Sequence, residues 1–265
     1  MDRNYILAPP VVSIDVTVDQ TYTMFNTLML LQTGERLSGV DPWLQQTFAA
    51  LPPERQAFHQ VFVNTVGDLL APQGPFSSFL AYLQHLSAQS AAELHTQTLQ
   101  GLGKWFSKQG NLPPEDWLSS PQRFTESLYA MIARHWEAKQ EDPNPRLHEY
   151  LTTLYTWLQD PAGFQARVVG HLRWLWETVL AAEWARVEPI LTESALAFRD
   201  RNGSMMAPNE AIRVITGRDL QGAWDEMLKT VTRLIFIPVP HIGPYVILNT
   251  GPGDLARILF GARLP

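Results

Sequence analysis

The sequence predicts a mainly α-helical protein with one small antiparallel β-sheet, in which an N-terminal strand pairs with strands near the C-terminus. Apolar and polar residues alternate at the start of the chain, apolar residues recur at helical spacing over the next two hundred positions, and short apolar runs follow. We expect a single helical domain over residues 1–265. Its elements are a strand at 11–18, a helical body at 20–231 and strands at 233–237 and 245–249.

The N-terminal strand has the clearest pattern. A period of two gives a strand one buried face and one solvated face. The apolar members of this alternation are Val12, Ile14, Val16 and Val18. From Asp19 onward the apolar period becomes helical, and Gly34 is a plausible stop for that helix.

Four helices of the body are expected to begin at a capping residue followed by proline. The cap side chain accepts a backbone N–H that has no helical partner, and proline has no N–H to leave unpaired. The four pairs are Asp41-Pro42, Ser120-Pro121, Asn144-Pro145 and Asp160-Pro161. The segment from Pro161 to Val187 is apolar on two sides, so we expect it in the middle of the bundle, with Pro189 dividing or kinking it.

The pattern returns to strand near the C-terminus. The apolar runs 234–237 and 245–248 are separated by Pro238, Pro240 and Pro244, which indicates two strands and a stiff connector. A lone N-terminal strand is not stable by itself. We therefore expect it to pair with these two strands in an antiparallel sheet.

Composition excludes several kinds of protein. The 265 residues include 20 Lys and Arg, 26 Asp and Glu, seven His and no Cys. Without cysteine there is no disulfide, no thiolate metal site and no cysteine nucleophile, and a net charge of −6 is a poor match to nucleic-acid phosphates. No signal-peptide pattern and no apolar run near the roughly 18 residues of a membrane span is present. We expect a cytoplasmic protein with no membrane partner.

No motif nominates a catalytic residue, a metal site or a cofactor. None of the seven histidines has another His, Asp or Glu three or four residues away, and no G-x-S-x-G is present. The match of Gly251-Pro-Gly253 to a dinucleotide fingerprint is only formal, because nine residues remain after Ala256. The stretch 209–231 is a poor helix-turn-helix, since Asp225 and Glu226 would face the DNA phosphates. We expect no catalytic residue, no metal, no cofactor and no DNA binding by this chain.

The aromatic residues of the helix that starts at Pro161 are the candidate ligand site. Aromatic walls with a few polar groups are typical of small-molecule pockets and also of ordinary cores. Trp184 and Glu177 are seven residues apart and are expected on nearly the same helix face. The candidate ligand-binding residues are His171, Trp174, Glu177 and Trp184, for a small apolar organic effector.

Several segments carry a family resemblance. They are VVSIDVTVDQTYTMFNTLMLL, DPWLQQTFAALPPERQ, LQDPAGFQARVVGHLRWLWETVLAAEWARVEPILTESALAF, VITGRDL, LIFIPVPHIGPYVILN and RILFGARLP. Their order resembles the long N-terminal sensor region of certain ArsR-type winged-helix transcription regulators of bacteria. The resemblance implies a sensing module that forms a homodimer and names no catalytic residue. In such regulators a winged helix follows the last matched segment, so DNA contact is implied only through a winged-helix module absent from this chain.

Three functions stay open at this point. The first is an effector-binding and dimerisation domain of a bacterial transcription regulator, which is not an enzyme and does not itself bind DNA. The second is a helical enzyme whose site is assembled from scattered residues, which requires a concave polar pocket with two titratable groups within hydrogen-bond reach. The third is a purely structural interaction module, which requires a large apolar dimer face and a filled interior.

Overall fold

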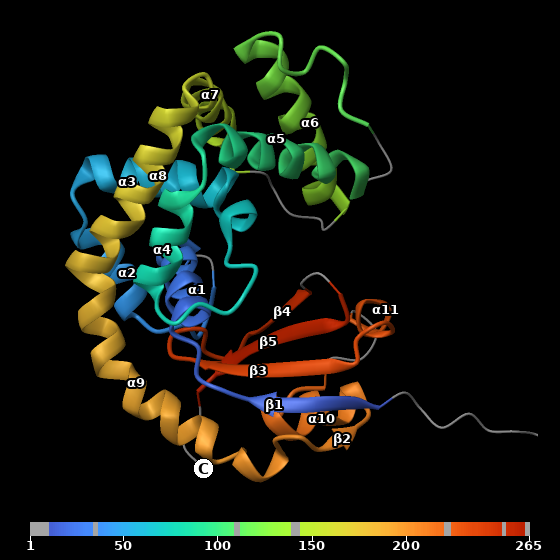
Figure 1. Cartoon of the computed structure of the whole chain (residues 1–265). Helices are drawn as coiled ribbons and strands as arrows, with labels where there is room; N and C mark the ends of the chain where they lie inside the picture. Colours follow the sequence, from blue (N-terminus) through green and yellow to red (C-terminus); the bar gives the residue numbers. More distant parts are fainter. Residues whose placement is uncertain are drawn as a thin grey trace, which may run out of the picture. The chain divides into compact units, whose positions relative to one another are not determined.

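The computed structural model describes residues 11–33, 37–108, 112–138, 144–219, 224–250 and 253–262 (Figure 1). The chain forms two compact units. The first, here called the sheet unit, consists of Met1–Gln45, Gln73–Pro75 and Leu180–Pro265. The second, the helical unit, consists of Gln46–Pro72 and Phe76–Val179. Each unit is described by itself, and the single domain expected over residues 1–265 stays a prediction.

The sheet unit is built on a five-stranded mixed sheet. Its strands are β1 (Val12–Val16), β2 (Met205–Met206), β3 (Arg233–Val239), β4 (Val246–Thr250) and β5 (Leu255–Gly261). They lie in the order β2-β1-β3-β5-β4, with β1, β3 and β5 parallel and with β2 and β4 antiparallel at the edges. The helices of this unit are α1 (Gln20–Thr33), α9 (Ala181–Leu196), α10 (Pro208–Thr216) and α11 (Asp225–Leu228), with a 3-10 turn at Arg199–Arg201.

The mainly helical class and the pairing of N-terminal with C-terminal strands are confirmed, but the antiparallel sheet is wrong. β1 pairs with β3 in parallel, and the two strands expected near the C-terminus do not pair with each other because β5 lies between them. The sequence analysis also missed β2 and β5. β5 is buried along its whole centre, so it lacks the alternation that marks a half-exposed strand.

Alternate residues of the three parallel strands form the apolar core of the sheet unit. These include Ile14, Phe236 and Ile258, which pack with Ile212 of α10 and Leu228 of α11. The opposite face carries the side chain of Arg257, whose guanidinium lies 4.6 Å above the ring of Tyr22 on α1. Helices therefore cover both faces of the sheet, as Figure 1 shows for α1 and α10.

The helical unit is a bundle of α-helices. They are α2 (Trp43–Ala50, which starts in the sheet unit), α3 (Pro53–Thr65), α4 (Phe79–Ala88), α5 (Ala91–Lys108), α6 (Pro121–Ala138), α7 (Leu147–Leu158) and α8 (Pro161–Leu175), with a 3-10 turn at Gly67–Leu70. α6 packs on α7, α4 and α5 pack on α8, and α3 contacts both α7 and α8. Among the helices in the described ranges, none combines the length and apolar character needed to cross a bilayer.

Helices follow all four predicted cap–proline pairs, but the N-cap residue of α7 is Arg146 and not Asn144. At each pair the side-chain oxygen of the first residue accepts a backbone N–H two or three residues further along the chain. The four bonds run from Trp43 to Asp41 at 2.9 Å, from Arg123 to Ser120 at 3.2 Å, from Arg146 to Asn144 at 2.9 Å and from Gly163 to Asp160 at 3.0 Å. These helix starts were therefore readable from the sequence alone.

The segment after Pro161 departs from its expected form in one way. Pro189 lies inside α9 and does not divide it; a π-helical turn at Trp176–Leu180 follows α8 instead. The expected central position holds for α8 within the helical unit, because α8 contacts α3, α4, α5 and α7, although Arg167 and Arg173 are exposed. The helix that is buried on nearly every side is α1.

Replacing Gly243 with Ala is expected to destabilise the sheet unit severely. Gly243 has a φ of +59°, and an added Cβ would lie 2.0 Å from the carbonyl oxygen of Gly39. Strain and a backbone clash therefore act together, and we expect a loss of about 3 kcal/mol or more in the free energy of unfolding. Thermal and urea-induced unfolding measure this loss.

Gly203 provides the matched control for this substitution. Its φ of +74° is also left-handed, but an added Cβ would meet open space. Gly203→Ala should therefore cost only the conformational penalty of about 1–2 kcal/mol. Equal losses in the two variants would contradict the close packing of Gly243 on Gly39.

Candidate functional site

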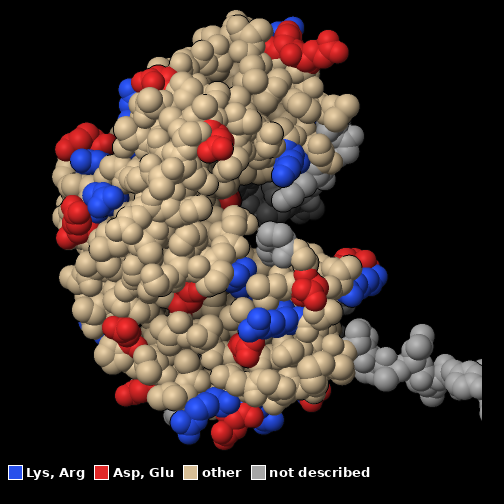
Figure 2. Space-filling view, in the orientation of Figure 1, with Lys and Arg blue, Asp and Glu red and all other residues tan. Residues whose placement is uncertain are grey.

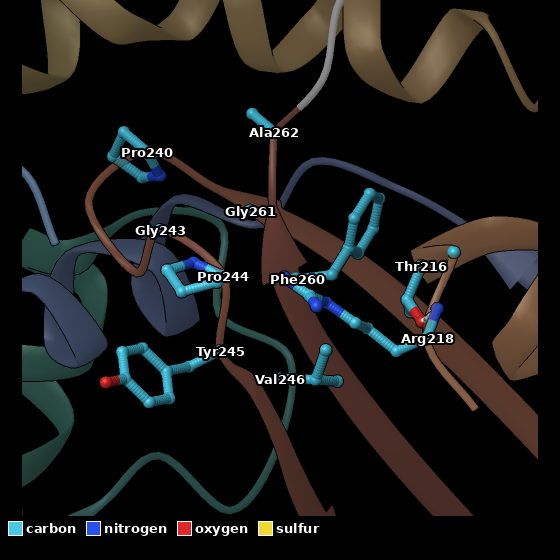
Figure 3. Close-up of a pocket in the computed structure, with 11 residues that line it drawn as sticks. Thr216, Arg218, Pro240, Gly243, Pro244, Tyr245, Val246, Phe260, Gly261 and Ala262 are labelled. Carbon is cyan, nitrogen blue, oxygen red and sulfur yellow. Dashed lines mark hydrogen bonds between the residues drawn. The ribbon is translucent and has the colours of Figure 1, made fainter. Parts of the chain in front are cut away.

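A cavity of about 250 Å³ opens at the carboxyl edge of the parallel strands in the sheet unit (Figure 3). β3 and β5 end side by side at this edge, with Val239 opposite Gly261. In open sheets of parallel strands, ligands bind outside the carboxyl ends of the strands. The cavity is therefore placed where a sheet of this kind binds small molecules.

Small residues keep this cavity open. Gly217 ends α10 in the left-handed conformation, and Gly261 lies so close to the Gly243 carbonyl oxygen that an added Cβ would be 2.5 Å from it. The loop of residues 240–245, here called the β3–β4 loop, thus lies directly against the end of β5. No larger side chain fits at these contacts without moving the backbone.

The remaining lining combines apolar side chains with two polar ones, Thr216 and Tyr245, and one charged one. Phe260 is buried, and Val246, Pro240 and Pro244 also line the cavity. Arg218 is the single ionic side chain among the lining residues. In Figure 3 its side chain extends across the cavity from the end of α10, whereas the hydroxyl of Tyr245 points away from it.

Thr216 positions the backbone from which Arg218 projects. Its hydroxyl donates to the carbonyl of Ile212 at 2.7 Å and accepts the backbone N–H of Arg218 at 3.2 Å. This pair of bonds closes the last turn of α10. The cation is therefore carried by a fixed backbone rather than by a free loop.

His241 anchors the β3–β4 loop on the side away from the cavity. It is 1% exposed, its Nδ1 lies 3.0 Å from Oδ2 of Asp41, and its ring stacks 4.5 Å from the ring of Trp43. Its Nε2 lies 2.9 Å from Oε1 of Glu183 on α9. Together with Arg186 these residues are called the His241 cluster below.

The charges of the His241 cluster are largely compensated. Glu183 is 4% exposed and receives Arg186 in a two-pronged ion pair, with Nε 2.9 Å from Oε2 and Nη2 on Oε1. Such bidentate pairing offsets the cost of burying a carboxylate. The pair holds Glu183 in place beside the imidazole.

Three pKa values in the cluster are shifted, and that of Arg186 is raised by its hydrogen bond to Glu183. Burial lowers the pKa of His241, against the raising effects of Asp41 and Glu183. Partial burial acts to raise the pKa of Asp41, but the backbone N–H of Trp43 and the His241 side chain outweigh it, so this pKa lies below its ordinary value. A neutral His241 donates from Nδ1 to the Asp41 carboxylate, which can only accept.

Nε2 of His241 makes no hydrogen bond among the described residues, although Glu183 is close to it. With Nδ1 as donor, this buried nitrogen carries a lone pair. His241 and Asp41 are two titratable groups within hydrogen-bond reach, as the enzyme hypothesis requires, but neither lines the cavity. The cluster as it stands holds the loop and does not face a ligand.

The candidate ligand residues from the sequence are not gathered in one place. His171 and Trp174 lie in the helical unit and Trp184 lies in the sheet unit. Glu177 is exposed and Trp184 is 8% exposed, so the two do not share a face; the π-helical turn between them changes the helical period. None of the four lines either cavity described here, and their ligand-binding role stays a prediction.

His171 is part of a buried histidine pair. Its Nε2 lies 3.1 Å from Nδ1 of His59, and the ring of Phe58 lies 4.5 Å from its own. Burial first, then the charges of His59 and Arg55, lower the pKa of His171 to about 2. Trp174 carries the guanidinium of Arg55 4.8 Å above its ring. This region has the character of a core rather than of a pocket.

A second cavity, of about 300 Å³, lies in the helical unit. It is lined by Leu99, Leu118, Phe124, Tyr155 and His95, among others, and by no Asp, Glu, Lys or Arg. Cavities between helices are common sites for apolar ligands. Within the described ranges, no group of three or more His, Asp or Glu converges as a metal site would require.

No family model matches the chain, and no curated protein and no solved structure matches it. Sequence reasoning missed Arg218 and His241 as site residues. Both lie in segments that carry the resemblance, VITGRDL and LIFIPVPHIGPYVILN, which was the one available signal.

The hydrogen bond between His241 and Asp41 is expected to appear as a coupling energy. A hydrogen bond to a charged group contributes about 1.5–3 kcal/mol. We expect His241→Phe and Asp41→Asn to be coupled by about 1–2 kcal/mol in a double-mutant cycle of unfolding free energies, because each removes the same bond. Asn retains the helix-capping oxygen, so the cycle isolates the contact with His241.

Asp15→Asn combined with His241→Phe serves as the control cycle. Asp15 forms an ion pair with Arg233 and has no shared partner with His241. The effects of these two substitutions on the free energy of unfolding should add to within about 0.5 kcal/mol. Additivity in the first cycle as well would show that the Asp41 contact does not hold the loop.

The buried His171 is expected to make the free energy of unfolding depend on pH. The pKa of His171 is about 2 in the folded chain, against about 6.5 for an unfolded histidine. Between these values only the unfolded state binds the proton, so the free energy of unfolding falls with pH below about 6.5, by up to 1.4 kcal/mol per unit. His171→Phe should reduce this dependence, measured by urea unfolding from pH 7 to pH 5, while the lowered pKa of His241 maintains a remainder of the same sign.

His85→Phe is the control for that measurement, because His85 is exposed in the same unit. It should leave the slope of stability against pH as in the parent chain. A slope that His171→Phe leaves unchanged would disprove the assignment of this proton to His171.

Proposed function

We propose that this chain is an effector-binding regulatory module whose effector is a small organic molecule bound at the carboxyl edge of the sheet. The observation that carries the proposal is the cavity beside the β3–β4 loop, whose other side is fixed to α9 and to the start of α2 by His241. One short loop thus contacts both a ligand-sized space and two structural elements. This arrangement supports the proposed role as a sensor.

The mechanism is a shift between two positions of the β3–β4 loop. A ligand that packs against Pro244 and Val246 favours one position of the loop. His241 then transmits the displacement of the loop to Glu183 of α9 within the sheet unit. The ligand shifts this equilibrium by no more than its differential affinity for the two states. A sensor of this kind needs no catalytic group.

The family resemblance supplies the biological context of the proposal. An ArsR-type regulator reads DNA through a winged helix, so this chain would act on transcription through such a module and would work as a homodimer. The segments that form the cavity, VITGRDL and LIFIPVPHIGPYVILN, are among those that carry the resemblance. Sensor function and the described geometry therefore involve the same residues.

The two rival functions fit the geometry less well. An enzyme needs its titratable pair inside the pocket, whereas His241 and Asp41 lie outside the cavity lining. A purely structural module needs a filled interior, whereas each unit contains a cavity of ligand size. Binding is the function that uses the space and the loop together.

A screen of small organic compounds by thermal shift tests the proposal. A compound present at 100 times its Kd adds about 2.7 kcal/mol of stability, which raises the Tm by several degrees. Val246→Trp, which fills the cavity, should abolish the shift. Leu118→Trp, which fills the cavity of the helical unit, should leave it unchanged.

The two variants give opposite results if the assignment of the site is wrong. A shift that Leu118→Trp abolishes and Val246→Trp preserves would move the effector to the helical unit. A broad screen in which no compound stabilises the parent chain would remove the sensor function altogether.

A further inference from the structure

We propose that the ligand of the sheet-unit cavity is a small organic monocarboxylate, whose carboxylate is bound by Arg218 and whose apolar body packs on Phe260 and Val246. This inference rests on the proposed function, since it names the chemical class of the effector. It differs from the apolar effector expected from the sequence.

The charge of the cavity is the first argument. Arg218 is its single ionic lining residue, and within the described part of the chain its guanidinium takes part in no ion pair. Asp219, which follows Arg218 in the chain, is not a lining residue, and neither are Glu183 and Asp41 of the His241 cluster. The cavity therefore presents one cation without its counterion, and an anionic ligand would supply it.

The geometry of Arg218 is the second argument. Its backbone is fixed by Thr216 at the end of α10, and its side chain reaches across the cavity in Figure 3. A guanidinium offers parallel N–H donors that match the two oxygens of a carboxylate. A neutral ligand of the same shape would leave these donors to water.

The size and polarity of the walls limit the rest of the ligand. The volume of about 250 Å³ lies just below the usual range of about 300–1,000 Å³ for small-molecule sites. Phe260, Val246 and Pro244 provide the apolar part of the lining. An acid with one ring or a short alkyl chain fits this space, whereas a nucleotide exceeds it.

A carboxylate fits the local charge better than a phosphate dianion. The cavity is lined by Gly217, the residue that ends α10. The carboxyl end of a helix carries a partial negative charge of about half an electron. One arginine beside a helix carboxyl end can balance a single negative charge and leaves a second one uncompensated.

The experiment compares acids with their neutral amides. The probes are benzoate, phenylacetate and butyrate, each paired with benzamide, phenylacetamide or butyramide, and binding to the whole chain is measured by calorimetry and NMR shifts at fixed ionic strength. We expect each acid that binds to bind at least tenfold more tightly than its amide. Inorganic phosphate, as a further probe, should bind more weakly than the best acid.

Substitutions then assign the preference to Arg218. Arg218→Gln should reduce acid affinity about tenfold and leave amide affinity unchanged, and Arg218→Lys should restore part of the loss. Arg213→Gln is the matched control, because Arg213 is exposed on α10, shortly before Arg218 in the chain, but does not line the cavity. It removes the same charge and should have little effect.

The outcomes separate this inference from the proposed function. Equal binding of acids and amides, both lost in Val246→Trp, would overturn the carboxylate and keep the sensor. Tighter binding of phosphate than of any acid, or an equal effect of Arg213→Gln and Arg218→Gln, would also overturn it. If no acid of the panel binds, the carboxylate proposal fails, and the general screen described above decides whether any effector exists.

Discussion

The parallel pairing of β1 with β3 is the contact on which the sheet unit depends. Thr17 donates to the carbonyl of Phe236 at 3.0 Å, and the register sets Val16 opposite Phe236, so segments from the two ends of the sequence lie side by side. The entropy of closing a long loop grows only with the logarithm of its length, at about 0.6 kcal/mol per doubling. A large helical insertion between paired strands is therefore tolerable, provided that β1 buries its apolar face, as Ile14 does completely.

Local signals in the sequence predicted the helices well and the sheet only in outline. Capping is a contact between neighbours, so Asp41 and Asp160 were readable from a few residues. Whether two strands pair in parallel or antiparallel depends on residues far apart in the sequence, and the same apolar run can form a strand of either kind. β5 was missed because Ile258, Leu259 and Phe260 are all buried, which leaves no alternation to recognise. The burial of α1, with Thr21 and Thr23 inside, was missed because threonine is usually read as polar.

The site was less predictable than the fold for a similar reason. Metal and acid–base motifs were sought at spacings of three or four residues, whereas His241 finds its partners far away in the sequence, at Asp41 and Glu183. Apart from its place in the segment VITGRDL, Arg218 carried no signal of its own, because an exposed arginine after a helix is common in proteins. The aromatic cluster around His171 and Trp174 did stand out, but such residues fill cores more often than they line pockets.

The β3–β4 loop is suited to transmit a displacement because few of its dihedral angles are free. Pro240 and Pro244 fix their own φ, and Gly243 is held in the left-handed region against Gly39. His241 is fixed by a hydrogen bond and by stacking on Trp43. In a flexible loop, a displacement caused by a ligand would be taken up by rotations about local backbone bonds and would not reach other elements. A ligand that displaced this loop would move it largely as one piece, and the displacement would reach Glu183 and Asp41 through the imidazole. The same rigidity explains why the cavity is preformed: its wall is set by contacts made on the far side of the loop.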